Sequence, residues 1–255
     1  IDNIYSIDPD GCTDIDDAIH VIQNNNNNNN NIQIGIHIAD VSSYIPIDSP
    51  LDKEIKNRCE SIYLSLDHDK QLHVPMLPKQ LVQQCSLTSK VKKRCYSILL
   101  TLEDNKIINT EFVRSTIIVK ENLSYDNAEN LVNNELKLMY NIGKLFINDE
   151  NYDTHKMVES YMILVNCLVA EKLPPKEALL RSHKGQQNII TNNDINPELV
   201  KYANLLMTEA AEYCIGISDE STHVGLNKKI YTHFTSGIRR YADLIVHRML
   251  FDNTY

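Results

Sequence analysis

The residues near the start of the chain that could do chemistry are carboxylates. The stretch SIDPDGCTDIDDAIH, residues 6–20, holds five aspartates within ten positions. Carboxylates held close together repel one another, and burying even one is costly unless a cation neutralises it. A turn containing Pro9 and Gly11 would let four of them converge, namely Asp8, Asp14, Asp16 and Asp17. Such oxygen ligands suit Mg²⁺ or Mn²⁺, so the stretch predicts a metal site, with an exposed acidic turn as the alternative.

Two other motifs for metal or phosphate chemistry do not fit the same aspartates. A calcium-binding EF-hand loop counted from Asp8 needs glycine at its sixth position and glutamate at its twelfth, where this chain has Thr13 and Ile19. The D-x-D phosphotransferase signature expects threonine or valine two residues after its second aspartate, and Ala18 stands there.

A second group of polar residues lies in YTHFTSGIRRYADLIVHR, residues 231–248. Ser236 is a good N-cap, and it would place Arg239 in the first turn of a helix. A helix N-terminus attracts anions, and an arginine there adds a charged fork for phosphate. Arg240 and Asp243 are three residues apart and could pair on the helix surface. The alternative is a capped surface helix with a salt bridge and no ligand.

Together, the aspartates and Arg239 would suit hydrolysis of a phosphodiester. A metal ion can activate water and bind phosphate, while an arginine stabilises the charge that develops in the transition state. Sequence spacing alone does not show that the two segments meet.

The elements that must position these residues follow from hydrophobic periodicity. Alternating apolar residues predict strands at 4–7, 18–22 and 32–41, with eight asparagines at 24–31 as an exposed hairpin tip. A second hairpin is expected from 95–102 and 108–119, with EDNK as its turn. Helical spacing predicts helices over 155–173 and 197–214, the latter with Tyr213 on its apolar face, and a last helix from about 237. Strands followed by helices indicate an α+β domain, with a mixed, largely antiparallel sheet flanked by helices.

Composition restricts the class of protein. No apolar run approaches a membrane span, and the six scattered cysteines include no C-x-x-C pair, which argues against structural zinc and favours a reduced, intracellular protein, cytoplasmic or nuclear. The net charge of −9 argues against nucleic acid, but lysine and arginine gather locally at 89–94, 179–185 and 237–248. Because the 255 residues begin at Ile1 and stop abruptly, we expect a domain of a longer polypeptide.

Four segments occur in an order that resembles a known family. SIDPDGCTDIDDAIH, GIHIADVSSYI, VPMLPKQLVQQCSL and IYTHFTSGIRRYADLIVHRML together look like the RNB catalytic domain of the ribonuclease II/ribonuclease R family, most like the eukaryotic branch that includes the exosome hydrolytic subunit. The likeness runs over nearly the whole chain, so residues 1–255 are expected to be one RNB-type domain, incomplete at its C-terminus. It implies a processive 3′→5′ exoribonuclease that uses Mg²⁺ or Mn²⁺, two ions in the active complex, and releases nucleoside 5′-monophosphates from single-stranded RNA with a free 3′ end. Flanking cold-shock and S1-type domains are expected in the full-length chain.

The resemblance also implies roles for individual residues. Asp8, Asp14, Asp16 and Asp17 match the family's metal-binding catalytic aspartates, and Arg239 matches its catalytic arginine. The other residues expected to contact RNA are Tyr63, Tyr125, Glu159, Asn166, Ser236 and Arg240. Gly237 stands where the family has proline, which predicts a looser turn before Arg239 and a gain in kcat for Gly237→Pro.

Two other functions remain open at this point. A catalytically weak RNA-binding or assembly module could retain the same fold, and Gly237 favours it. A metal-dependent phosphohydrolase acting on small molecules is the other, but it gives no reason for the VPMLP and HFTSGIRRY segments.

Overall fold

The centre of the molecule is a curved six-stranded sheet. The computed structural model describes residues 3–24, 31–67, 70–130, 133–147, 149–185, 196–207 and 209–252. The sheet has the strand order β7-β6-β3-β2-β1-β8, and its strands are β1 Tyr5–Asp8, β2 Asp17–Asn24, β3 Asn31–Ala39, β6 Lys92–Glu103, β7 Lys106–Ile118 and β8 Glu121–Ser124. All neighbours are antiparallel except β1 and β8, which run parallel. The predicted α+β class with a mixed, largely antiparallel sheet is confirmed.

The hairpins of this sheet follow the alternation in the sequence. Ile34, Ile36 and Ile38 of β3 are buried in one apolar cluster, as their period of two predicts. The ladder between β2 and β3 extends to the pair Asn24–Asn31, and the asparagines between them lie outside the described residues. Between β6 and β7, Asp104 and Asn105 both have positive φ, which is the backbone that a tight hairpin turn requires.

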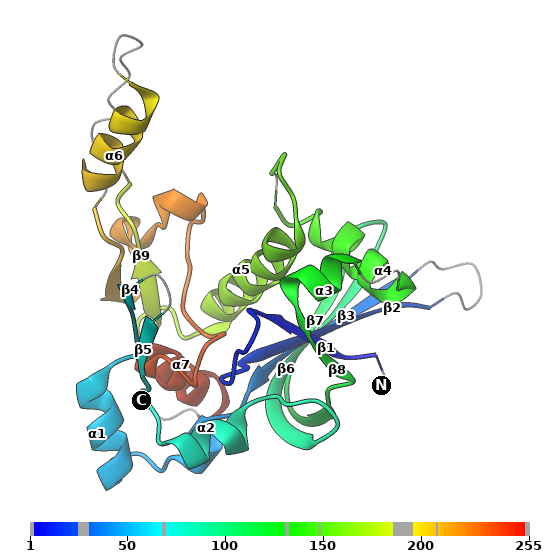
Figure 1. The fold of residues 1–255 in the computed structure, drawn as a ribbon, viewed down its shortest axis with the longest axis horizontal. Helices are drawn as coiled ribbons and strands as arrows, with labels where there is room; N and C mark the ends of the chain where they lie inside the picture. Colours follow the sequence, from blue (N-terminus) through cyan, green and yellow to red (C-terminus); the bar gives the residue numbers. More distant parts are fainter. Residues whose placement is uncertain are drawn as a thin grey trace.

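Helices cover one face of the sheet. Figure 1 shows α3 (Tyr125–Asn130), α4 (Asn134–Gly143) and α5 (Thr154–Lys172) on the same side of the strands. Asp153 caps α5 by accepting a hydrogen bond from the Lys156 N–H at 2.8 Å. Met157, Tyr161 and Val165 of α5 are buried in the same apolar cluster as the isoleucines of β3. This packing fixes the face of α5 that is left for the site.

A second apolar cluster lies where the remaining helices gather. It draws side chains from α1 (Pro50–Arg58), α2 (Lys79–Cys85) and α7 (Tyr241–Phe251), including Ile55, Val82 and Leu244. Two short two-stranded sheets complete the fold: β4 (Ile62–Asp67) with β5 (Lys70–Val74), and β9 (Leu179–Ser182) with β10 (Glu212–Ile215). Three-residue 3₁₀ helices lie at Ser42–Tyr44, Asp219–Ser221 and Val224–Leu226.

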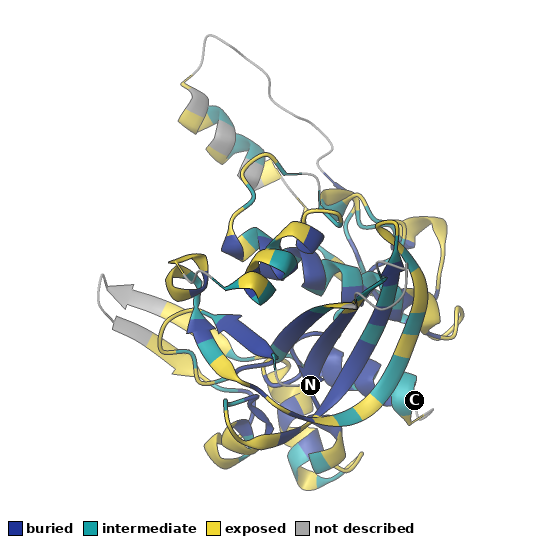
Figure 2. Cartoon of the chain, turned by 90° about the vertical axis from the view of Figure 1, so that its right-hand side faces the viewer, coloured by how far each residue is buried: buried dark blue, intermediate teal, exposed yellow. Residues whose placement is uncertain are grey.

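The helix predicted over 197–214 is wrong in its second half. Helix α6 (Pro197–Met207) ends early, and Tyr213 lies in β10, paired across the sheet with Arg181 of β9. Leu199 and Tyr202 of its expected apolar face are exposed, and Figure 2 shows α6 standing away from the body. Residues 212–215 pair with β9, about 30 residues earlier in the chain, and this strand pairing overrides their local helical pattern.

None of the helices that the structure describes has the length and apolar character needed to cross a lipid bilayer.

A hydrogen-bonded row of polar side chains crosses the sheet opposite α5. His20 Nδ1 lies 2.9 Å from His37 Nε2, and His37 Nδ1 lies 2.6 Å from Ser97 Oγ. Both imidazoles are buried, and burial lowers their pKa to about 4 for His20 and about 3 for His37, so both are neutral at pH 7. A Cβ added at Gly35 would overlap the His20 ring, so glycine is needed there.

Gly35→Ala is expected to lower the free energy of unfolding by about 1–3 kcal/mol or more, because the added methyl group and the His20 ring compete for one space. Thermal unfolding measures the loss. In the double variant with His20→Ala the competition is gone, so the loss should be smaller than the sum of the two single losses. A strictly additive double variant would contradict the steric explanation.

Candidate active site

Asp8 and Asp17 meet at one edge of the sheet because neighbouring strands bring them there. Asp8 ends β1, Asp17 begins β2, and these strands are antiparallel neighbours. The loop between them turns at Gly11, which has a φ of +76°, a conformation that glycine adopts without a Cβ penalty. The predicted return of the acidic turn on itself is thus present.

The raised pKa values of Asp8 and Asp17 show that carboxyl groups lie close together here. Burial, together with the charge of Asp14, raises the pKa of Asp8 to about 6. Burial raises the pKa of Asp17 well above its usual value, and the charges of Asp8 and Asp16 add to the effect. Asp8 Oδ2 is buried and accepts no hydrogen bond from any described residue. Two carboxyl groups that repel one another, one with an unsatisfied oxygen, are suited to binding a cation.

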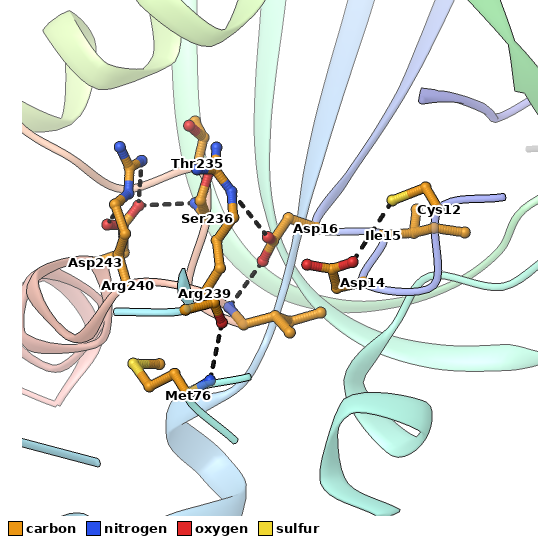
Figure 3. A network of polar contacts seen from close by, with 12 residues as sticks. Cys12, Asp14, Ile15, Asp16, Met76, Thr235, Ser236, Arg239, Arg240 and Asp243 are labelled. Carbon is orange, nitrogen blue, oxygen red and sulfur yellow. Dashed lines mark hydrogen bonds and ion pairs between the residues drawn. The ribbon is translucent and has the colours of Figure 1, made fainter. Parts of the chain in front are cut away.

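Asp16 points instead to the segment that precedes α7 and carries Arg239 and Arg240 (Figure 3). This segment, residues 231–240, is called the arginine segment below. Asp16 is buried, its Oδ1 accepts a hydrogen bond from the Ile238 N–H at 2.8 Å, and its Oδ2 lies 3.9 Å from Arg239 Nε. Burial raises the pKa of Asp16 to about 8, and the Ile238 N–H and Arg239 partly offset the rise. Asp16 therefore joins the two segments that sequence spacing could not bring together.

Asp14 is held by the loop and by the β4–β5 hairpin. Cys12 Sγ lies 3.7 Å from Asp14 Oδ1, and the Tyr63 hydroxyl donates to Asp14 Oδ2 at 2.5 Å. Tyr63 is 53 % exposed and its ring stacks on His73, with centroids 4.4 Å apart. Burial and this hydrogen bond raise the pKa of the Tyr63 hydroxyl. Tyr63 is thus held over the aspartates rather than packed in the core.

Helix α7 begins later than predicted, and Ser236 does not cap it. The helix starts at Tyr241, and Arg239 lies in the turn before it. The Ser236 N–H donates to Asp243 Oδ1 at 2.7 Å, and its hydroxyl accepts from Arg239 Nη2 at 2.9 Å.

The physical reason is that backbone groups of the arginine segment bond to a distant segment. The Ser61 N–H donates to the Arg239 carbonyl at 2.8 Å, and the Tyr241 N–H donates to the Cys59 carbonyl at 2.7 Å. These bonds hold Arg240 in an extended conformation paired with Glu60, and Arg239 in the turn before it, so the helix cannot include them.

The pair between Arg240 and Asp243 is present but lies in the interior. Arg240 Nη2 donates to Asp243 Oδ1 at 3.0 Å, and Asp243 is fully buried. The prediction of a pair on the helix surface is therefore wrong as to place. Asp243 accepts hydrogen bonds from both Arg240 and Ser236, and so anchors the arginine segment to the first turn of α7.

Every predicted site residue lines one cavity of about 550 Å³. Those residues are Asp8, Asp14, Asp16, Asp17, Tyr63, Tyr125, Glu159, Asn166, Ser236, Arg239 and Arg240. They come from β1, the loop between β1 and β2, β2, β4, α3, α5 and the segment before α7. The structure thus brings together residues from the two ends of the chain, and a direct hydrogen bond joins Asp16 to Ile238, 222 positions later.

The two residues predicted on α5 differ in surroundings. Asn166 is buried, its Nδ2 donates to the Tyr231 hydroxyl at 2.9 Å, and its Oδ1 accepts from the Phe234 N–H at 2.9 Å. Asn166 therefore shapes the arginine segment. Glu159 is partly exposed and pairs with Lys156 at 2.7 Å.

Sequence reasoning missed some of the cavity wall. His155 stacks on Tyr125 with ring centroids 3.7 Å apart, and it lines the cavity with Tyr231 and Met162. His155 and Met162 carry no motif in the sequence. Tyr231 lies within the arginine segment, where the quoted motif could have suggested it.

The site fits a divalent metal ion only in part. Among the residues that the structure describes, no group of three His, Cys, Asp or Glu side chains is placed to hold a metal ion. The buried, unsatisfied Oδ2 of Asp8 beside Asp17 is nevertheless the kind of oxygen donor that Mg²⁺ binds. Mg²⁺ commonly uses one or two carboxylates and completes its shell with water and substrate phosphate. The geometry therefore favours Asp8 and Asp17 as ligands, with Asp14 and Asp16 engaged elsewhere.

The chain is similar to known proteins over nearly its whole length. A family model described as the RNB domain matches residues 2–142 and 133–254. The exosome complex exonuclease RRP44 of Mus musculus is 30% identical over 97% of this chain and 33% of its own length, so the chain spans about a third of that relative. Mycoplasma genitalium RNase R, solved with ribose-methylated single-stranded RNA, superposes with a TM-score of 0.78 at 25% identity, over 99% of this chain and 51% of that chain. Yeast Ssd1, described as a pseudonuclease, gives a TM-score of 0.81 at 24% identity over 99% and 40%.

A metal ion at this site should stabilise the fold more at high pH than at low pH. Without metal, the raised pKa values of Asp8, about 6, and Asp16, about 8, mean that the folded state favours the protonated carboxyls. Their stabilisation is present at low pH and is lost as pH rises through those values. Buried histidines with lowered pKa values, such as His20 and His37, make an opposite contribution, so the Tm is compared with and without metal at each pH. Saturating Mg²⁺ should raise the Tm above its value in EDTA by about 5 °C or more at pH 8 and by less at pH 5. Thermal unfolding scans measure this, and an Mg²⁺ effect equal at both pH values would contradict it.

The argument for proline at position 237 does not hold in this structure. The helix that proline would start begins at Tyr241, and a Cβ at Gly237 would lie 2.9 Å from Cε1 of the buried His247. We now expect Gly237→Pro and Gly237→Ala both to lower the free energy of unfolding by about 1–3 kcal/mol, without a gain in kcat. Urea titration and turnover measurements check this. A proline variant that is both stable and faster would restore the sequence-based expectation.

Proposed function

The chain belongs to the RNB domain family, and on that premise we propose that it is a metal-dependent 3′→5′ exoribonuclease that hydrolyses single-stranded RNA to nucleoside 5′-monophosphates. The observation that carries the proposal is the cavity in which buried carboxylates, an arginine and two tyrosines from distant segments meet. Processive action, two metal ions and flanking cold-shock or S1-type domains belong to the same proposal.

In this proposal Asp8 and Asp17 hold the metal. Their mutual repulsion, and the unsatisfied Oδ2 of Asp8, would be relieved by a cation. Bound Mg²⁺ would supply an activated water and neutralise charge on the scissile phosphate. Asp14 would join this shell once Tyr63 releases it, since its Oδ2 now accepts the Tyr63 hydroxyl hydrogen.

Arg239 is proposed to stabilise the negative charge that develops on the phosphate. Its side chain is 44 % exposed, so it can reach a substrate in the cavity, while its Nη2 is held by the Ser236 hydroxyl. Asp16 orients the segment by accepting the Ile238 N–H. A preorganised donor of this kind costs no reorganisation during the reaction.

Tyr63 and Tyr125 are proposed to contact the 3′-terminal nucleotides. Tyr63 presents a half-exposed ring above the aspartates. Tyr125 lies beside Asp8 and Asp17, directly after the end of β8, where Ser124 pairs with Asp8. Stacking on aromatic rings tolerates every base, which suits an enzyme that must digest any sequence.

A catalytically weak RNA-binding module is the second candidate. The likeness to a yeast pseudonuclease shows that this fold by itself does not decide activity. The hydrogen bonds that engage Asp14 with Tyr63 and Asp16 with Ile238 favour this candidate. The buried carboxylates and Arg239 favour the enzyme, because an inactive module gains nothing from burying charges that oppose folding.

The test uses 5′-labelled single-stranded RNA with Mg²⁺ or with EDTA. The wild-type chain should shorten it from the 3′ end and release nucleoside 5′-monophosphates, in Mg²⁺ only. Asp17→Asn and Arg239→Lys should each lower the rate by about 10²–10³-fold, because the first weakens the proposed metal site and the second removes the guanidinium proposed to stabilise charge on the phosphate. Asp10→Asn is the matched control, since Asp10 belongs to the same acidic loop, is exposed and lies outside the cavity.

Binding of the RNA without shortening by any protein would support the RNA-binding module instead. Shortening that persists in Asp17→Asn, or that is lost equally in Asp10→Asn, would overturn the assignment of the site.

A further inference from the structure

A second group of aromatic and cationic side chains lies beside the cavity, on the β9–β10 sheet and the segment that follows it. The Arg181 guanidinium lies over the Tyr213 ring, 4.5 Å from its centroid. The Tyr213 hydroxyl is 2.7 Å from His233 Nδ1. Arg181 and Tyr213 face one another in the β9–β10 ladder, so the backbone fixes their contact. None of these residues has a role in the proposed chemistry.

This group is continuous with the cavity. The His233 ring contacts Tyr231, with centroids 5.8 Å apart, and Tyr231 lines the cavity. Arg240, another lining residue, influences the pKa of both His233 and Tyr213 through its charge. A chain leaving the cavity on this side therefore meets His233, Tyr213 and Arg181 next.

The chemistry of the three side chains matches single-stranded nucleic acid. Burial, together with the charge of Arg240, lowers the pKa of His233 to about 4, so its ring is neutral at pH 7. With the Tyr213 hydroxyl donating to Nδ1, the ring hydrogen is on Nε2, which can donate to a base or a phosphate. Tyr213 is 43 % exposed, and no carboxylate of the described residues pairs with Arg181. A fixed exposed ring next to an available guanidinium offers stacking for a base and a charge for a phosphate.

We propose that Arg181, Tyr213 and His233 form a subsite for a nucleotide on the 5′ side of the nucleotides held in the cavity, and this rests on the proposed function. Because the 3′ end occupies the cavity, the strand outside it extends in the 5′ direction. Tyr213 stacks on a base there, and Arg181 binds the adjoining phosphate. The hydrogen bond to His233 holds the ring in place before RNA binds, which lowers the entropic cost of binding. An acidic net charge is compatible with this subsite, because binding depends on local cations.

Binding measured without cleavage separates this subsite from the cavity. Fluorescence anisotropy in EDTA would give Kd values for a 4-nucleotide and a 12-nucleotide RNA labelled at the 5′ end. Tyr213→Ala and Arg181→Ala should weaken binding of the longer RNA about 5- to 30-fold and that of the shorter RNA less than 2-fold. Arg181→Ala should also reduce the slope of log Kd against log salt by about 0.7, as loss of one phosphate contact predicts. Tyr213→Phe, which keeps the ring, should retain most of the affinity.

The matched control is Tyr202→Ala, which removes an exposed tyrosine from α6 and should leave both Kd values unchanged. An unchanged Kd for the longer RNA in both Tyr213→Ala and Arg181→Ala would overturn the subsite. So would an equal loss for both lengths, which would place the effect in the cavity or in folding.

Cleavage assays then distinguish this inference from the proposed function. If the wild-type chain shortens RNA while the variants lack a length effect, the subsite fails and the exoribonuclease stands. If the wild-type chain shortens no RNA but the length effect is present, the exoribonuclease fails and the subsite survives as part of an RNA-binding surface.

Discussion

The site depends on one buried carboxylate. Asp16 accepts the Ile238 N–H at 2.8 Å and lies 3.9 Å from Arg239 Nε, which joins the first strands to a segment 222 residues later. Because a carboxylate without partners is costly in the interior, the fold gains most when the arginine segment supplies them. This single contact decides where Arg239 lies relative to Asp8 and Asp17.

A second set of contacts holds the arginine segment from the other side. Backbone bonds from Ser61 and to Cys59 tie it to the strand that carries Tyr63, so the aromatic and the cationic walls of the cavity are set together. Arg248 of α7 pairs with Asp52 of α1 at 2.8 Å, and both side chains are buried. Breaking such a pair by removing one partner leaves an unpaired buried charge, so these contacts rigidify the region. Rigid walls on both sides preorganise the cavity for one geometry of substrate.

The charge distribution is compatible with the proposed action of an acidic chain on RNA. The net charge of −9 includes aspartates that the cavity keeps buried at raised pKa, where a cation would offset them. The cations proposed to contact RNA are placed by the fold, with Arg239 in the cavity and Arg181 on the adjoining sheet. Net charge therefore says little about this surface, because short-range contacts outweigh distant screened charges.

The sequence by itself determined the antiparallel hairpins, helix α5 and eleven of the residues that line the cavity, because periodicity and turn chemistry are local and the motifs carry their own residue types. Only the tertiary structure decided the start of α7, the strand at Tyr213 and the different orientations of Asp16 and Asp17. In each case a backbone or carboxylate group found its hydrogen-bond partner in a segment far along the chain: Cys59 for Tyr241, β9 for β10, and Ile238 for Asp16. Such partners compete with local helix bonds on equal terms, and no local pattern records them.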